Sequence, residues 1–151
     1  KLGRSTSTLY FRDRFMSARR NLFSAENANE GVLHALFHLA LFVSPETPKV
    51  FGIDNLETCL NPRLCRVLTK ELAALAKARD KQAIVTTHNP AVLDGLNLHD
   101  DDQRLFVVSR DDDGRTVVKR IALKPQPETG TRFMLSELWM RGHLGGIPKQ
   151  F

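Results

Sequence analysis

The sequence predicts an α/β fold in which helices flank a mostly parallel sheet and a β-hairpin follows near the C-terminus. Two short apolar runs, Val50 to Ile53 and Gln82 to Thr87, end in polar residues, as buried strands of a parallel sheet do. Helical patterns precede, separate and follow these runs, and this alternation is typical of parallel sheets with crossover connections. The 151 residues are 42% hydrophobic, so we expect a single domain over residues 1–151.

The N-terminal third is expected to contain a short strand, a charged segment and a long helix. Ser7 to Phe11 has the composition of a strand, and we interpret the arginine-rich segment FRDRFMSARR that follows as helical. Asn29 to Val43 carries apolar residues on almost every side, which predicts a buried helix.

Capping and turn residues place the later elements. Asn61-Pro62 supplies an N-cap and a proline at the first helical position, which predicts a helix reaching about Arg79. The stretch PAVLDGL predicts a short helix after the second strand, and Asp-Gly between two β-rich runs predicts a hairpin. The hairpin strands are expected at Leu105 to Ser109 and Thr116 to Ala122, and a last helix at Met134 to Met140.

Composition narrows the class of protein. No apolar run is long enough to cross a membrane and the N-terminus lacks a secretory signature, so we expect a cytoplasmic protein with no membrane partner. Cys59 and Cys65 are expected to be reduced thiols.

The net charge is +5, and basic residues crowd at the start of the chain, where they can bind phosphate backbones or form a solvated face. These residues are Lys1, Arg4, Arg12, Arg14, Arg19 and Arg20.

Polar side chains follow both predicted parallel strands. Asp54 closes the first strand, and Thr87-His88 closes the second. Ligands of open α/β sheets bind at the carboxyl ends of the strands, so we expect these groups to share a site. An aspartate there can hold Mg²⁺ beside nucleotide phosphates, and a histidine can donate a hydrogen bond to a phosphate oxygen.

The order and spacing of these motifs resemble the C-terminal half of the ABC-like branch of P-loop ATPases. More narrowly, the chain is similar to AAA-family ATPases grouped with RecF, SMC and OLD-type proteins, many of which serve in bacterial anti-phage defence. VFGIDNLETCLNP resembles the Walker B strand and D-loop, VTTHNPAVLDGL the switch-histidine segment, ANEGVLHAL the signature motif and SELWMRGHLGGIP the C-terminal tail. The resemblance covers nearly the whole chain.

The resemblance implies a role for individual residues. Asp54 takes the place of the Walker B acid that orders Mg²⁺, Asn55 that of the catalytic glutamate, and His88 that of the γ-phosphate sensor. The signature helix would present its first N–H groups to ATP held by a second protomer. The other nucleotide-binding positions that the resemblance implies are Asn29, Glu30, Gly31, Asn61 and Thr87.

Three departures from the family pattern bear on activity. Asn29 replaces the usual signature serine, and Asn55 cannot take a proton from water as a carboxylate does. Loss of a general base typically lowers the rate by about 10²–10⁴-fold, and Glu57 is the nearby acid that could substitute. No Gly-x-x-x-x-Gly-Lys-Ser/Thr loop occurs in the 151 residues, so binding of ATP and Mg²⁺ would need a Walker A loop from outside this segment. We therefore expect the chain to be a piece of a longer protein.

Three functions stay open at this point. The first is an ATPase module whose homodimer or higher oligomer sandwiches ATP and controls an effector or a nucleic-acid transaction. The second is a non-hydrolysing ATP-binding scaffold that recruits a partner such as a nuclease. The third is a basic module that binds DNA or RNA. His34 and His38 have zinc-ligand spacing, but HALFH lacks the glutamate of a zinc protease, and we expect both to be packing residues.

Overall fold

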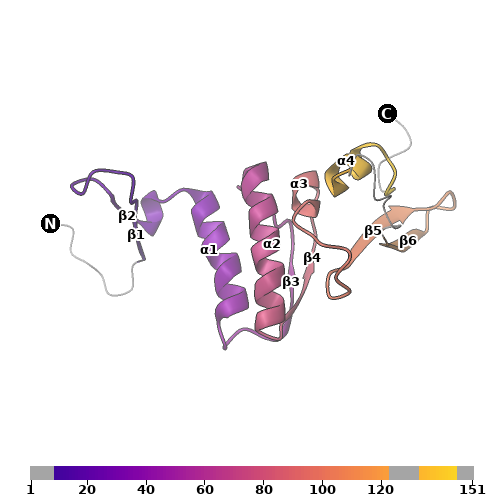
Figure 1. The fold of residues 1–151 in the computed structure, drawn as a ribbon, viewed down its shortest axis with the longest axis horizontal. Coiled ribbons are helices and arrows are strands. Elements are labelled where there is room, and N and C mark those ends of the chain that lie inside the picture. Colours follow the sequence, from indigo (N-terminus) through magenta and orange to yellow (C-terminus); the bar gives the residue numbers. More distant parts are fainter. Residues whose placement is uncertain (1–8, 123–132, 146–151) are drawn as a thin grey trace.

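The computed structural model describes residues 9–122 and 133–145. Within these ranges the strands form three two-stranded sheets, and helices lie between them (Figure 1). The expected mostly parallel sheet is wrong for this part of the chain, because one sheet is parallel and two are antiparallel hairpins. The strands are β1 Tyr10–Arg12, β2 Leu22–Ser24, β3 Val50–Ile53, β4 Gln82–Val85, β5 Leu105–Arg110 and β6 Thr116–Ile121. The helices are α1 Glu30–Val43, α2 Pro62–Ala78, α3 Pro90–Leu93 and α4 Leu135–Met140, with a 3₁₀ turn η1 at Ala25–Asn27.

The central unit is the expected succession of α1, β3, α2, β4 and α3. β3 and β4 pair in parallel, and Ile53 lies opposite Val85 at their carboxyl ends. Helix α2 begins as predicted, because the Asn61 side chain accepts a hydrogen bond from the Leu64 N–H at 2.9 Å and Pro62 follows the cap. The core gathers around the inner face of α2 and comprises Phe42, Ile53, Leu56, Leu60, Cys65, Leu68, Leu72 and Val92.

Helix α1 forms where the sequence predicts it but is less buried than expected. Its buried residues are Gly31, His38 and Phe42, and the Phe42 ring meets Phe51 of β3 edge-on at 5.1 Å. Lys81 closes the other end of the helix by donating to the carbonyls of Leu41 and Ser44. No described element covers the far side of α1, so apolar side chains there stay exposed. They are Val32, Leu36, Phe37 and Val43.

One face of the parallel pair is likewise open. Val50 and Ile84 point to the same side of the sheet, and Ile84 is 68% exposed. Parallel sheets are ordinarily covered on both faces. Each of these strands has one neighbour in the described part, so the expectation that Val50 to Ile53 is an interior strand is not met there.

The arginine-rich segment is a loop and not the expected helix. Residues 13–21 connect β1 to β2, with Phe11 opposite Phe23 in an antiparallel pair. The Asp13 N–H donates to the Asn21 carbonyl at 2.8 Å and closes the loop. Ser7 and Thr8, the start of the first expected strand, lie outside the described residues.

The C-terminal elements follow the sequence. β5 and β6 form the predicted hairpin, and Gly114 takes the left-handed φ of +77° that its turn requires. Helix α4 docks on α3 because both Ser136 N and Oγ donate to the Asp94 carboxylate, at 2.9 and 2.8 Å. On this helix Leu135 is buried, whereas Met140 is exposed. No helix of the described residues has the length and apolarity needed to cross a bilayer.

Candidate functional site

The ends of β3 and β4 lie together at one edge of the parallel sheet. The Thr86 N–H donates to the Ile53 carbonyl at 2.9 Å, and the Leu56 N–H donates to the Thr86 carbonyl at 3.2 Å. The pairing therefore continues past both strands, and it brings Asp54 beside the segment that holds His88. The carboxyl ends of the two strands therefore meet at one edge, as expected, whereas a phosphate site shared by the Asp54 carboxylate and the His88 ring stays a prediction.

Thr86 fixes the carboxylate of Asp54. Its hydroxyl donates to Asp54 Oδ1 and accepts from the Asn55 N–H at 3.0 Å, so one side chain orients both residues after β3. Asp54 is exposed, which leaves the carboxylate open to a cation and water. Sequence reasoning did not single out Thr86, although its place one residue past β4, beside the acid, was readable from the parallel register.

Asn55 lies in a strained position with an unused acceptor. Its φ is +50°, a left-handed conformation that asparagine tolerates better than most residues. The Thr58 N–H and hydroxyl stabilise this bend by donating to the Asn55 carbonyl, at 3.0 and 2.8 Å. The side-chain Oδ1 is buried and has no donor among the described residues. The residue Asn55 lines a hollow of about 330 Å³ between α1 and β3, together with Asp54. An amide oxygen there can orient a water molecule but cannot take its proton.

Glu57 ties the loop after β3 to the segment after β4. Oε2 accepts from the Thr87 hydroxyl at 2.6 Å, and Oε1 accepts from the His88 N–H at 2.9 Å. Burial would raise the pKa of Glu57, but these hydrogen bonds and the nearby His88 outweigh it and leave the pKa below its usual range. A carboxylate with both oxygens used and a lowered pKa is a weak proton acceptor. The geometry gives Glu57 a positioning role, which sequence reasoning had missed.

The switch segment is fixed through its main chain, while the histidine side chain stays exposed. Thr87 Oγ1 also accepts from the Asn89 N–H at 3.0 Å, and the Asn89 side chain caps α3 by accepting from the Ala91 N–H at 3.0 Å. His88 lies between these two anchored residues with its ring exposed. Its backbone is therefore held while its imidazole can meet a ligand.

The N-terminus of α1, the predicted signature position, packs directly on the loop after β3, the predicted D-loop. Asn29 caps α1 by accepting from the Gly31 N–H at 2.8 Å. A Cβ on Gly31 would lie 2.6 Å from the Cys59 carbonyl oxygen, so only glycine fits under the loop. The Cys59 thiol donates to Glu30 Oε2 at 3.1 Å, and this bond raises the pKa of the thiol and keeps it protonated. Cys59 itself has φ of +60°.

Three predicted nucleotide-binding residues use their side-chain oxygens within the fold. Asn29 and Asn61 cap helices, and the Thr87 hydroxyl is bonded to Glu57. The amide nitrogens of Asn29 and Asn61 are the donors that these side chains can still offer to a phosphate. Their role as nucleotide ligands stays a prediction.

The two histidines of α1 belong to the wall of the same hollow. His38 is 4% exposed, and its Nδ1 has no partner among the described residues. Burial, followed by the neighbouring His34, lowers the pKa of His38, so the ring is neutral at pH 7. Its ring packs on Phe37 at 5.8 Å and on His34 at 6.2 Å, as expected for packing residues.

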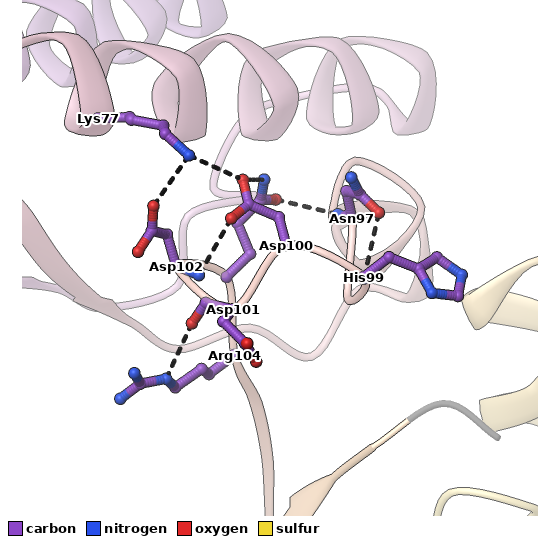
Figure 2. Close-up of polar contacts among 8 residues, drawn as sticks. Lys77, Asn97, His99, Asp100, Asp101, Asp102 and Arg104 are labelled. Carbon is purple, nitrogen blue, oxygen red and sulfur yellow. Dashed lines mark hydrogen bonds and ion pairs between the residues drawn. The ribbon is translucent and has the colours of Figure 1, made fainter. Parts of the chain in front are cut away.

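A second polar cluster lies at the opposite end of α2. Figure 2 shows Lys77 between Asp100 and Asp102, at 3.6 and 2.9 Å. Asp100 also accepts from the Asp102 N–H and Gln103, and these bonds lower the pKa of its carboxyl. The cluster holds the loop after α3 against α2. Its acids are already partnered by groups of the protein.

The residues at the sheet edge suit Mg²⁺ and nucleotide phosphates. Within residues 9–122 and 133–145, no group of three or more His, Cys, Asp or Glu side chains could hold a metal ion. Mg²⁺ does not need such a cage, because it is usually bound by one or two carboxylates together with water and phosphates. The exposed Asp54 carboxylate offers one such ligand and leaves the remaining positions of the ion to water and phosphates.

A comparison with known protein families gives a match over the region that contains this sheet edge. A family model described as "AAA domain, putative AbiEii toxin, Type IV TA system" matches residues 14–94. The match covers more than half of the chain and includes the start of α1, the residues after β3 and the segment after β4 that holds His88. No curated protein and no solved structure matches the chain.

Proposed function

The chain belongs to this family of AAA domains, and on that premise we propose that it is the ATP-binding module of an ABC-like P-loop ATPase related to the RecF, SMC and OLD-type group. AAA domains have the P-loop NTPase fold and generally use ATP and Mg²⁺. The observation that carries the finer proposal is the joined edge of β3 and β4, where Asp54 and His88 are held by Thr86 and Glu57.

Each residue at this edge has a chemical part in the proposal. Asp54, oriented by Thr86, holds Mg²⁺ through its water shell, and the ion supplies charge neutralisation to the phosphates when bound. His88 donates from its exposed ring to a phosphate oxygen. Asn55 Oδ1 orients a water molecule next to them.

The proposed unit is a dimer in which each signature helix completes the other protomer's site. The N-terminus of α1 carries the positive end of the helix dipole, and the Asn29 amide nitrogen adds a donor. ATP then favours the closed dimer by binding it more tightly than the open form. Residues 1–151 form one domain of the core in this scheme, and the phosphate-binding loop comes from another segment, because no such motif occurs in them.

Asn55 supports a second candidate, a silent ATP-binding scaffold that recruits an effector such as a nuclease. A side-chain amide cannot accept the proton of an attacking water, and both Glu57 oxygens are engaged by the switch segment. In this case nucleotide binding controls assembly, and turnover is slow or absent. The two candidates share the same site and differ only in hydrolysis.

Asp54→Ala in the complete protein tests the shared site. We expect this change to abolish dimerisation driven by Mg-ATP, measured by light scattering after size-exclusion chromatography. Asp113→Ala, which removes an exposed carboxylate from the β5–β6 turn, is the matched control and should dimerise normally. Equal Mg-ATP-dependent dimerisation of the wild type and Asp54→Ala would refute the proposed site.

Two further measurements separate the remaining alternatives. Residues 1–151 alone should bind Mg-ATP weakly in isothermal titration, and a micromolar affinity would contradict the need for an outside loop. Phosphate release by the complete wild-type protein would exclude the silent scaffold. Release that appears only after Asn55→Glu would favour the scaffold, since a carboxylate restores a proton acceptor.

A further inference from the structure

The β1–β2 hairpin, with Arg12 at the end of β1 and three arginines in its loop, gathers positive charge without acidic partners. Arg12, Arg14, Arg19 and Arg20 are exposed, and none forms an ion pair with a carboxylate of the described residues. The single acid of this hairpin is Asp13, whose side chain accepts from the Phe15 N–H at 2.8 Å and so shapes the turn. The positive charge is therefore unbalanced and faces solvent.

The same loop exposes an aromatic ring. Phe15 is 85% exposed, and the Arg14 guanidinium stacks over it at 4.7 Å from the ring centroid. A guanidinium and a phenyl ring are both flat, and nucleobases stack on both kinds of surface. The hydrophobic effect alone would favour burying Phe15, so its exposure next to four arginines calls for a ligand that is both anionic and planar.

The hairpin is anchored, so the loop is presented in a defined place. The Asp13 and Arg20 N–H groups donate to the carbonyls of Asn21 and Ser17, at 2.8 and 2.9 Å. At its base the Ala25 N–H donates to the Leu9 carbonyl at 2.9 Å. In Figure 1 the hairpin lies beyond α1 at one end of the molecule, away from the β5–β6 hairpin. Nothing in the described part of the chain covers it.

We propose that the loop 13–21, which we name the arginine loop, binds single-stranded nucleic acid. The arginines contact phosphates, and the Arg14–Phe15 pair stacks on an unpaired base. Unpaired bases are required because the faces of paired bases are covered within a duplex. An anionic membrane is the other surface that attracts arginine. The loop has Phe15 and Met16 as its exposed large apolar side chains, which is little area for insertion into lipid.

The position of the loop links it to the ATP site. Strand β2 runs through η1 into the Asn29 cap of α1, and the Asn27 side chain bonds Ser24 Oγ at 3.0 Å across that turn. The arginine loop, and any nucleic acid bound to it, is therefore connected through the short hydrogen-bonded segment β2–η1 to helix α1. Binding itself does not depend on the proposed ATPase function, because the loop is formed without any residue of the sheet edge.

Fluorescence anisotropy with a labelled 20-nucleotide poly(dT) strand, titrated at several salt concentrations on the complete protein, tests the proposal. Each phosphate contact in a single strand contributes about −0.7 to the slope of log K against log salt, so removing three contacts should make the slope less negative by about 2. The variant is Arg14→Gln/Arg19→Gln/Arg20→Gln. Phe15→Ala should weaken binding by about tenfold while changing the slope little.

The control removes the same charge elsewhere. Arg66→Gln/Arg79→Gln/Arg110→Gln neutralises three exposed arginines outside the loop and should keep wild-type affinity and slope. Equal losses in both triple variants would overturn the proposal, because the binding would then follow net charge. Tighter binding to a duplex of the same length, or binding to phosphatidylserine vesicles without binding to the oligonucleotide, would overturn it too. Asp54→Ala should bind the oligonucleotide like the wild type without ATP, which separates this result from failure of the ATP site.

Discussion

Replacing Glu57 with alanine removes the carboxylate that joins the loop after β3 to the segment after β4. Two hydrogen bonds are lost, one from the Thr87 hydroxyl at 2.6 Å and one from the His88 N–H at 2.9 Å. A hydrogen bond to a charged group contributes about 1.5–3 kcal/mol, and the half-buried position of Glu57 places these two near the lower limit. We expect Glu57→Ala to lower the free energy of unfolding by about 2–3 kcal/mol.

Glu57→Gln removes the negative charge of the side chain but keeps its shape. The amide oxygen can still accept from the His88 N–H, and the amide nitrogen can donate to the Thr87 hydroxyl, so the loss should stay below about 1 kcal/mol at pH 7. Urea denaturation measures both variants, and Glu46→Ala, at an exposed acid in the turn after α1, is the control. Equal stability of Glu57→Ala and Glu57→Gln would refute a stabilising role for the hydrogen bonds of Glu57 to Thr87 and His88.

The lowered pKa of Glu57 makes the free energy of unfolding depend on pH. A carboxyl whose folded-state pKa lies below its unfolded value stabilises the protein above the unfolded pKa and loses that contribution as the pH falls through the folded pKa. The stability difference between wild type and Glu57→Gln should therefore be present at pH 7 and shrink as the pH drops below about 5. A difference that stays constant to pH 3 would contradict the assignment.

Other substitutions test the neighbouring contacts. Gly31→Ala should lower the free energy of unfolding, measured by urea denaturation, by about 1–3 kcal/mol, because its Cβ would meet the Cys59 carbonyl. Gly52→Ala should be neutral or slightly stabilising, because its Cβ would meet the Ile84 carbonyl oxygen at an ordinary contact distance of 3.9 Å. Asn55→Gly should keep full stability and Asn55→Glu should lose about 1 kcal/mol, because φ is +50°; equal stabilities would argue against the left-handed conformation. The wild type should lose stability from pH 7 to 5, as a buried neutral histidine must charge on unfolding, and His38→Leu should flatten that profile in denaturant titrations. An unchanged profile would exclude His38 as the source.

Local signals in the sequence were sufficient for the helices and the parallel pair. Asn61-Pro62 marks the start of α2, and Asn29 marks that of α1, because capping chemistry depends on adjacent residues only. Apolar runs that end in polar residues likewise marked β3 and β4. Membership of the family is shown, and these elements carry the motifs that predicted it.

Features that depend on distant contacts were missed. Strand β2 is three residues long and is stabilised by its pairing with β1, so its own residues give no clear strand signal. Without that strand the hairpin was not predicted, and the loop before it was interpreted as a helix. The exposure of Phe37 on α1 depends on which elements cover the helix, which composition cannot show. The hydrogen bonds of Glu57 arise from the register of β3 against β4, and a register is invisible in a single strand.

The contacts at the sheet edge join elements that sequence motifs treat as separate. The loop after β3 touches the N-terminus of α1 through the Cys59 thiol and carbonyl, and five residues earlier Asp54 is held by Thr86, the residue that follows β4. Between these contacts, Glu57 holds the backbone of His88. A ligand that moved the histidine segment would therefore displace the loop after β3, and this loop could not shift without disturbing Gly31 beneath it. Since close-packed contacts of this kind transmit displacement, we expect the sheet edge and the N-terminus of α1, which the proposal assigns to two different nucleotide sites of the dimer, to respond together within one chain.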